Sequence, residues 1–156
     1  MKQYFTRVIL PSALLVGTLD ITAATIQYYM RTGKDPLNVP RFVASGVFGQ
    51  QAFSGGTPMA AWGLLFHYLI AFSFSVFFFW IYRKWAFLAK YRILTGILYG
   101  IFIWMVMNLV VLPLSNTPPL SLNIGKAAEA ASILICMIGL PLSFIAARNR
   151  PAGRNL

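Results

Sequence analysis

Four long apolar runs dominate the chain and are separated by more polar connections. They cover residues 8–30, 58–82, 93–114 and 122–147. A helix needs about 20 apolar residues to cross the hydrocarbon core of a bilayer, and each run is long enough. Tyrosine and tryptophan residues lie near the ends of the runs, as they do in membrane helices. The pattern therefore predicts an all-α membrane protein, with a four-helix transmembrane bundle formed by one domain over residues 1–156.

The first connection, residues 31–57, is the longest and differs from the others in carrying its own apolar pattern. Asn38 is typical of a helix cap and Pro40 of a first helical turn. Residues 38–53 then predict an amphipathic helix that lies on the outer membrane surface, or a re-entrant segment that dips into it. An interfacial anchor and a lid over the spans both fit this pattern.

Each predicted span carries one polar side chain that is costly to place in lipid. These residues are Asp20 in the first span, His67 in the second, Asn108 in the third and Glu129 in the fourth. A charge at the bilayer centre costs roughly 2.5–3.5 kcal/mol on insertion scales, so such groups usually face a bundle interior or a wet cavity. They are therefore the first candidates for a functional site.

Small residues accompany these polar residues at steps of three or four along each helix. The four resulting faces comprise Ala13, Gly17, Asp20, Ala24 and Gln27; Gly63, His67, Ala71 and Ser75; Gly96, Gly100, Trp104 and Asn108; and Gly125, Glu129, Ser132, Cys136 and Gly139. In membranes, helices approach closely along faces of this kind. A rise of about 1.5 Å per residue places the four polar groups in the outer half of the bilayer. We therefore expect a polar pocket there, with Lys126 beside Glu129.

Simpler interpretations exist for several of these residues. Lys126 and Glu129 are three apart and can pair along one helix. Asn108 can serve only as a hydrogen-bonding contact between helices. Asp20 has no basic residue within its neighbouring turns, so we expect it to contact His67, with which it can share a proton.

Composition and charge placement narrow the class further. Hydrophobic residues make up 58% of the chain and charged residues 10%, which excludes an ordinary soluble domain. The net charge is +10, but the cations lie at the ends of the apolar runs rather than in a basic stripe, so the expected partner is the lipid bilayer and not nucleic acid. The apolar pattern also resumes after Asp20, which favours a retained first span over a cleaved signal peptide.

The distribution of the 13 lysine and arginine residues predicts the orientation. Nine fall on the side of the two termini, namely Lys2, Arg7, Arg83, Lys84, Lys90, Arg92, Arg148, Arg150 and Arg154, against Arg31, Lys34, Arg41 and Lys126 on the other side. Cytoplasmic segments carry the excess of positive residues. We therefore expect a multi-pass protein of the bacterial inner (plasma) membrane with both termini in the cytoplasm.

The residue inventory argues against most enzymatic chemistry. The single histidine excludes haem held by two histidines, and the single cysteine, Cys136, excludes an internal disulfide. A phosphate-binding glycine loop and a nucleophile elbow are both missing. Asp20, His67 and Glu129 have the donor types of a metal site, but no spacing motif supports one. We expect no enzyme activity, no cofactor and no metal.

Two classes of function remain. In the first, the polar pocket serves small-solute or proton-linked transport. In the second, the protein is structural or accessory, and the buried polar groups only fix helix packing. The cytoplasmic halves of the first, second and fourth spans are almost wholly apolar, which favours a closed pocket over a pore. A homo-oligomer or another membrane partner could supply the missing half of a path.

Three strings carry a resemblance to known proteins: residues 17–24 (GTLDITAA), 44–49 (ASGVFG) and 106–115 (VMNLVVLPLS). The chain resembles a group of small uncharacterised bacterial inner-membrane proteins, loosely similar to the YagU-like proteins. The resemblance covers most of the chain, although the larger soluble loops of that type are missing. It implies a four-span bacterial membrane protein and nothing about catalysis.

Overall fold

A computed structural model describes residues 2–118 and 123–149, and all regular structure in these segments is helical. The elements in chain order are α1 (Lys2–Tyr4), η1 (Phe5–Ile9), α2 (Leu10–Thr32), α3 (Asn38–Phe48), α4 (Gln51–Ser54), α5 (Gly56–Lys84), α6 (Ala86–Lys90), α7 (Arg92–Val106), η2 (Met107–Val111), α8 (Leu112–Leu114), α9 (Ile124–Leu134), η3 (Ile135–Gly139) and α10 (Leu140–Arg148).

Four continuous helices among the described residues are long and apolar enough to cross a membrane. They are Phe5–Thr32, Gly56–Lys84, Arg92–Leu114 and Ile124–Arg148. Between 17% and 28% of the residues in their most apolar stretches are buried, so most of these residues stay at least partly accessible at the surface. Soluble monomers rarely expose apolar surface on this scale. The outward faces therefore fit a lipid environment.

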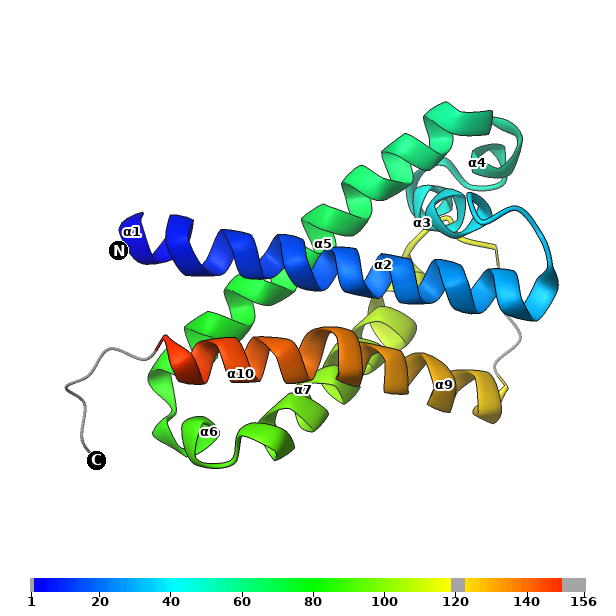
Figure 1. Cartoon of the computed structure of the whole chain (residues 1–156). Helices are drawn as coiled ribbons and strands as arrows, with labels where there is room; N and C mark the ends of the chain where they lie inside the picture. Colours follow the sequence, from blue (N-terminus) through cyan, green and yellow to red (C-terminus); the bar gives the residue numbers. More distant parts are fainter. Residues whose placement is uncertain (1, 119–122, 150–156) are drawn as a thin grey trace.

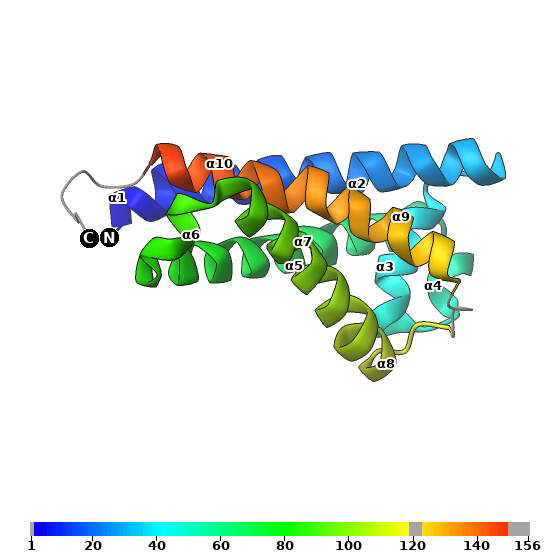
Figure 2. The same ribbon diagram turned by 90° about the horizontal axis from the view of Figure 1, so that it is seen from below.

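The long helices do not run as a simple parallel set (Figure 1). The α9–η3–α10 helix runs alongside α2, and α5 crosses α2 at a marked angle. The α7–η2–α8 helix packs on η3 and α10 near its start and leaves the other long helices toward α8 (Figure 2). The start of α1 and the end of α10 lie at one end of the molecule, which we call the terminal end. Helices α3 and α4 lie at the opposite end.

Three single turns of π-helix interrupt the long helices, and a Leu-Pro pair follows each one directly. The N–H groups of Leu10, Leu112 and Leu140 donate to carbonyls five residues back, at the starts of η1, η2 and η3. Proline lacks an N–H and clashes with the carbonyl four residues before it in an α-helix. The wider π turn gives the ring room. Because each π turn adds a residue, it also rotates the following helix face by about 100° relative to a regular α-helix.

The largest apolar cluster lies toward the terminal end and joins all four long helices. Its members are Val16, Phe78, Phe79, Tyr82, Tyr99, Ile103, Ile138, Leu142 and Ala146. The rings of Phe78 and Tyr99 meet edge to face with their centroids 4.6 Å apart. The Tyr99 hydroxyl donates to the Phe74 carbonyl at 2.6 Å, so its polar end is satisfied within the cluster. We call this group the aromatic core.

Glycine contacts allow two pairs of helices to pack backbone to backbone. A side chain at Gly139 would collide with the Gly96 carbonyl, so α7 and the end of η3 touch directly. A side chain at Gly63 would likewise collide with the Pro40 carbonyl, where α3 meets α5. The Gly-x-x-x-Gly face of the third span is therefore a helix contact, as its spacing predicts.

Helix α3 differs in detail from its sequence prediction. Asn38 does not cap it, because the residue at the cap position is Leu37 and no side chain caps the helix. A break at Gly49, with φ of 59°, separates α3 from α4. At its C-terminal end, the backbone N–H and side-chain amide of Asn116 donate to the Gly46 and Val47 carbonyls, both at 3.0 Å. Helix α3 is thus packed against α5 and joined to the α8–α9 connection.

Candidate functional site

Asp20 and His67 lie together where α2 crosses α5. The His67 Nε2 atom is 4.0 Å from the Asp20 Oδ2 atom, and only 11% and 16% of the two side chains are accessible. The same Nε2 is 2.8 Å from the Gly17 carbonyl oxygen. A carbonyl only accepts hydrogen bonds, so Nε2 must carry the proton. Neutral His67 therefore keeps Nδ1 unprotonated.

Small residues bring the two helices close enough for this contact. A Cβ on Gly17 would lie 3.0 Å from the Tyr68 ring and 3.2 Å from the Ala71 methyl group. Thr18 donates to the Leu14 carbonyl in its own helix at 2.8 Å. Its oxygen therefore accepts from the Tyr68 hydroxyl, 2.9 Å away. The crossing is held by two hydrogen bonds between helices, one from His67 and one from Tyr68.

Glu129 forms an ion pair with a residue of another helix, and not with Lys126, its neighbour in sequence. The Arg31 Nη1 atom, at the end of α2, lies 2.6 Å from the Glu129 Oε2 atom in α9. About half of each side chain is exposed. Lys126, the neighbour one turn away, forms no ion pair within the described part of the chain. Arg31 was not among the predicted site residues because its partner is 98 positions away.

Asn108 lies in η2 and bonds within its own helix, donating to the Trp104 carbonyl at 2.9 Å. Among residues 2–118 and 123–149, no hydrogen bond or ion pair joins Asn108, Lys126 or Glu129 to Asp20 or His67. The structure thus brings together two of the five predicted site residues. One pocket shared by all five stays a prediction.

The predicted polar face of the fourth span is open rather than closed by a neighbour. Glu129, Ser132 and Cys136 are exposed and line a groove of about 630 Å³ between α2 and the α9–η3 helix. Gln27 and Arg31 line its other side. Only Gly139, the last residue of the π turn, is buried on that face. The extra residue in η3 explains why the face does not continue unbroken into the contact with α7.

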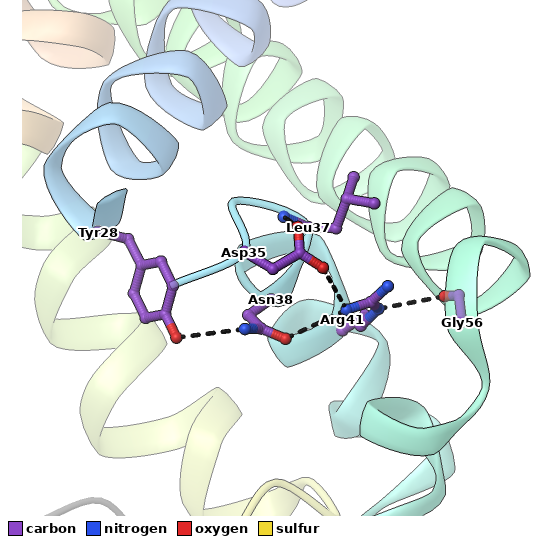
Figure 3. Close-up of polar contacts among 6 residues, drawn as sticks. All are labelled: Tyr28, Asp35, Leu37, Asn38, Arg41 and Gly56. Atoms are coloured by element: carbon purple, nitrogen blue, oxygen red, sulfur yellow. Dashed lines mark hydrogen bonds and ion pairs between the residues drawn. The ribbon is translucent and has the colours of Figure 1, made fainter. Parts of the chain in front are cut away.

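A second polar network lies at the start of α3 (Figure 3). The Arg41 Nη1 atom donates to Asp35 Oδ2 at 2.9 Å and to Asn38 Oδ1 at 3.3 Å, and its Nε donates to the Gly56 carbonyl at 3.1 Å. Asn38 in turn donates to the Tyr28 hydroxyl at 3.4 Å. The network therefore links the end of α2, the start of α3 and the start of α5. Arg41 is its centre, and 13% of that side chain is accessible.

Asp35, the acidic residue of this network, is held in place by a local turn. Its Oδ1 accepts from the Leu37 N–H at 3.0 Å, two residues on, as in an Asx turn. That backbone hydrogen bond is the main reason why the pKa of Asp35 lies below its usual value, and Arg41 lowers this pKa further. The carboxylate is therefore charged whenever the network is formed near neutral pH.

The described residues hold no group of three His, Cys, Asp or Glu side chains that could bind a metal ion. Glu129 contacts Arg31 and not the Asp20–His67 pair. Asp20, His67 and Glu129, the metal ligands considered from the sequence, therefore do not meet at one point. The α2–α5 crossing places one carboxylate beside one imidazole, with 4.0 Å between the Asp20 Oδ2 and His67 Nε2 atoms.

Length, composition and outward apolar faces together define the class: the chain has the four apolar helices of a multi-pass membrane protein. No protein-family model matches the chain, and no curated protein or solved structure matches it either. The resemblance to YagU-like proteins accordingly stays a prediction.

Proposed function

We propose that this chain is a non-enzymatic accessory protein of the membrane, in which the intramembrane polar residues hold the helices in register. The observation that carries the proposal is that the polar residues form separate contacts inside the protein. Asp20 and His67 meet at the α2–α5 crossing, and Glu129 and Arg31 join α9 to α2. Hydrogen bonds between membrane helices stabilise packing by about 0.6 kcal/mol on average.

The aromatic core supports a closed protein rather than a conducting one. Its rings fill the space among the four helices toward the terminal end, on the far side of the polar contacts from α3. A transported ion would have to cross this cluster, which contains no ionisable Asp, Glu, His, Lys or Arg side chain. An apolar barrier of that kind opposes ion passage.

The proposal includes the orientation predicted by charge, with both termini in the cytoplasm and the protein in a bacterial inner membrane. The clustering of the start of α1 and the end of α10 at one end is consistent with it. In this arrangement α3 and α4 face the outside and cover the ends of α2 and α5. Helix α5 has 29 residues, about 43 Å of helix, so it must tilt to fit a hydrocarbon core about 30 Å thick.

Reconstituted liposomes test the proposal. The purified chain is inserted with a pH-sensitive dye inside, and proton flux is compared with that of protein-free liposomes and of Asp20→Asn. We expect no added flux from either protein. Thermal unfolding is then measured for His67→Leu, which should lose about 0.6 kcal/mol and at most about 1.7 kcal/mol with its hydrogen bond to Gly17. Thr22→Val, an exposed position in α2, is the control and should leave stability unchanged.

Proton-linked transport is the second candidate, and the 4.0 Å separation of the His67 and Asp20 side chains favours it. This distance is just beyond direct hydrogen-bond reach, so a proton would pass between the two side chains through one bridging water molecule. Flux through the wild-type protein that disappears in Asp20→Asn, with stability retained, would replace the accessory role with this one.

A further inference from the structure

A second surface feature lies at the terminal end, between η1 and the last turns of α5. It is a hollow of about 720 Å³, within the about 300–1,000 Å³ typical of small-molecule sites. Ile9, Val76 and Phe79 form its apolar part. Arg83, Lys84 and two tryptophans, Trp80 and Trp85, form the rest. We call it the basic hollow.

Aromatic rings, not carboxylates, hold the two cations of the basic hollow. The Lys84 Nζ atom lies 4.1 Å from the centre of the Trp80 ring, and the Arg83 Cζ atom lies 5.7 Å from the centre of the Tyr4 ring. Tyr4 itself meets Phe79 edge to face with ring centroids 6.2 Å apart. Cation–π contacts position a cation but leave its charge uncompensated.

The chain has no carboxylate side chain left to neutralise these cations. It contains three acidic residues, and each contacts a basic residue elsewhere: Asp20 with His67, Asp35 with Arg41 and Glu129 with Arg31. Nine of the 13 lysine and arginine residues fall on the terminal side in sequence, with no acidic residue among them. An anion that balances Arg83 and Lys84 must therefore come from outside the side chains of this protein.

We propose that the basic hollow binds a phospholipid with an anionic headgroup from the leaflet on the terminal side. The phosphate lies between Arg83 and Lys84, and an acyl chain lies along Ile9, Val76 and Phe79. Trp80 and Trp85 are exposed, at 54% and 64%, and tryptophan is enriched at the depth of the lipid headgroups. Basic pockets beside transmembrane helices recognise anionic lipids in this way. The site is independent of whether the protein moves protons.

The topology rule offers a competing explanation, since cations at a cytoplasmic end orient a protein without binding any particular lipid. The two explanations differ in whether the position of a cation matters. Arg83 and Lys84 line the hollow, whereas Lys90 and Arg148 belong to the same end and do not. The double variants Arg83→Gln/Lys84→Gln and Lys90→Gln/Arg148→Gln remove equal charge and form a matched pair.

The test uses the full-length protein in a non-ionic detergent with added phosphatidylglycerol, phosphatidylcholine or inorganic phosphate. The midpoint of thermal unfolding is followed as each is titrated. We expect a saturable rise with phosphatidylglycerol and a smaller one with phosphatidylcholine. The Arg83→Gln/Lys84→Gln variant should need about 30-fold more phosphatidylglycerol for half of the rise. The Lys90→Gln/Arg148→Gln variant should stay close to the wild type.

Three results would overturn the proposal: equal stabilisation by the two lipids, an equal loss in both double variants, or full stabilisation by inorganic phosphate alone. Native mass spectrometry gives a second measurement on the wild-type chain if the Arg83→Gln/Lys84→Gln variant does not fold. One phosphatidylglycerol retained per chain in the presence of excess phosphatidylcholine supports the site. Preferential retention of phosphatidylcholine, or of neither lipid, contradicts it.

Discussion

The Arg31 guanidinium lies 2.6 Å from the Glu129 carboxylate and joins the end of α2 to α9 across 98 positions of sequence. Both residues line the groove between the two helices, together with Gln27, Ser132 and Cys136. Their contact leaves Lys126 without an ion pair among the described residues, although Lys126 is closer to Glu129 in sequence.

A double-mutant cycle of Arg31→Gln and Glu129→Gln should show a small coupling. Both side chains are about half exposed, and exposed pairs contribute about 0.2–1 kcal/mol. The coupling should fall as salt is added, because counterions screen exposed charges. The free energy of unfolding in detergent measures it. A parallel cycle of Lys126→Gln with Glu129→Gln is the control and should show no coupling. A larger coupling in this second cycle would show that Glu129 pairs with Lys126 in its own helix and not with Arg31.

Gly139→Ala should be strongly destabilising. The added methyl group collides with the Gly96 carbonyl, a backbone atom that cannot turn aside, so α7 and the end of η3 must move apart. Overpacking of this kind typically costs about 1–3 kcal/mol. Gly46→Ala in α3 is the control, because its Cβ would meet only ordinary contacts at 3.7 Å and alanine favours a helix. Thermal unfolding of both variants distinguishes them.

Ser143→Ala should lower stability through a hydrogen bond between helices. Buried Ser143 in α10 donates to the Arg92 carbonyl at the start of α7, at 2.7 Å. The loss should be about 0.6 kcal/mol and no more than about 1.7 kcal/mol, the range measured between membrane helices. Exposed Ser132 donates only to Ala128 in its own helix, so Ser132→Ala should have little effect. Equal losses in the two variants would show that the contact with Arg92 contributes nothing.

The pKa of Asp35 gives a prediction for acidic pH. It lies below the usual value of 3.8, so this residue stabilises the start of α3 above pH 3.8 and stops doing so as the pH falls through the lowered pKa. The chain has two aspartates, so ¹³C-labelled aspartate gives two carboxyl signals, and Asp35→Asn identifies one of them. Arg41→Gln should raise the midpoint only part of the way to 3.8, since the Leu37 N–H is the main cause. A midpoint at or above 3.8 in the wild type would contradict the network.

Hydropathy alone predicts the four long helices to within a few residues, because apolar length is a local property of the sequence. The close approach at Gly96 also follows from local spacing. The π turns do not follow from hydropathy, which does not register one extra residue, although a proline at 11, 113 or 141 stands two positions after each turn. The Arg31–Glu129 pair was missed for another reason: partners in different helices depend on how the helices rotate about their axes, and η3 changes that rotation.

The π turn in η3 also bears on how the length of this chain can vary in evolution. It holds one residue more than an α-helical turn needs, so loss of one residue between 135 and 139, together with replacement of Pro141, would restore a regular helix. The faces on both sides of that turn would keep their partners. Helix α5 has no such turn, and a deletion within it would rotate the positions beyond it by about 100° and move His67 or Phe78 out of contact. Single-residue length differences should therefore be tolerated in the first, third and fourth long helices and selected against in the second.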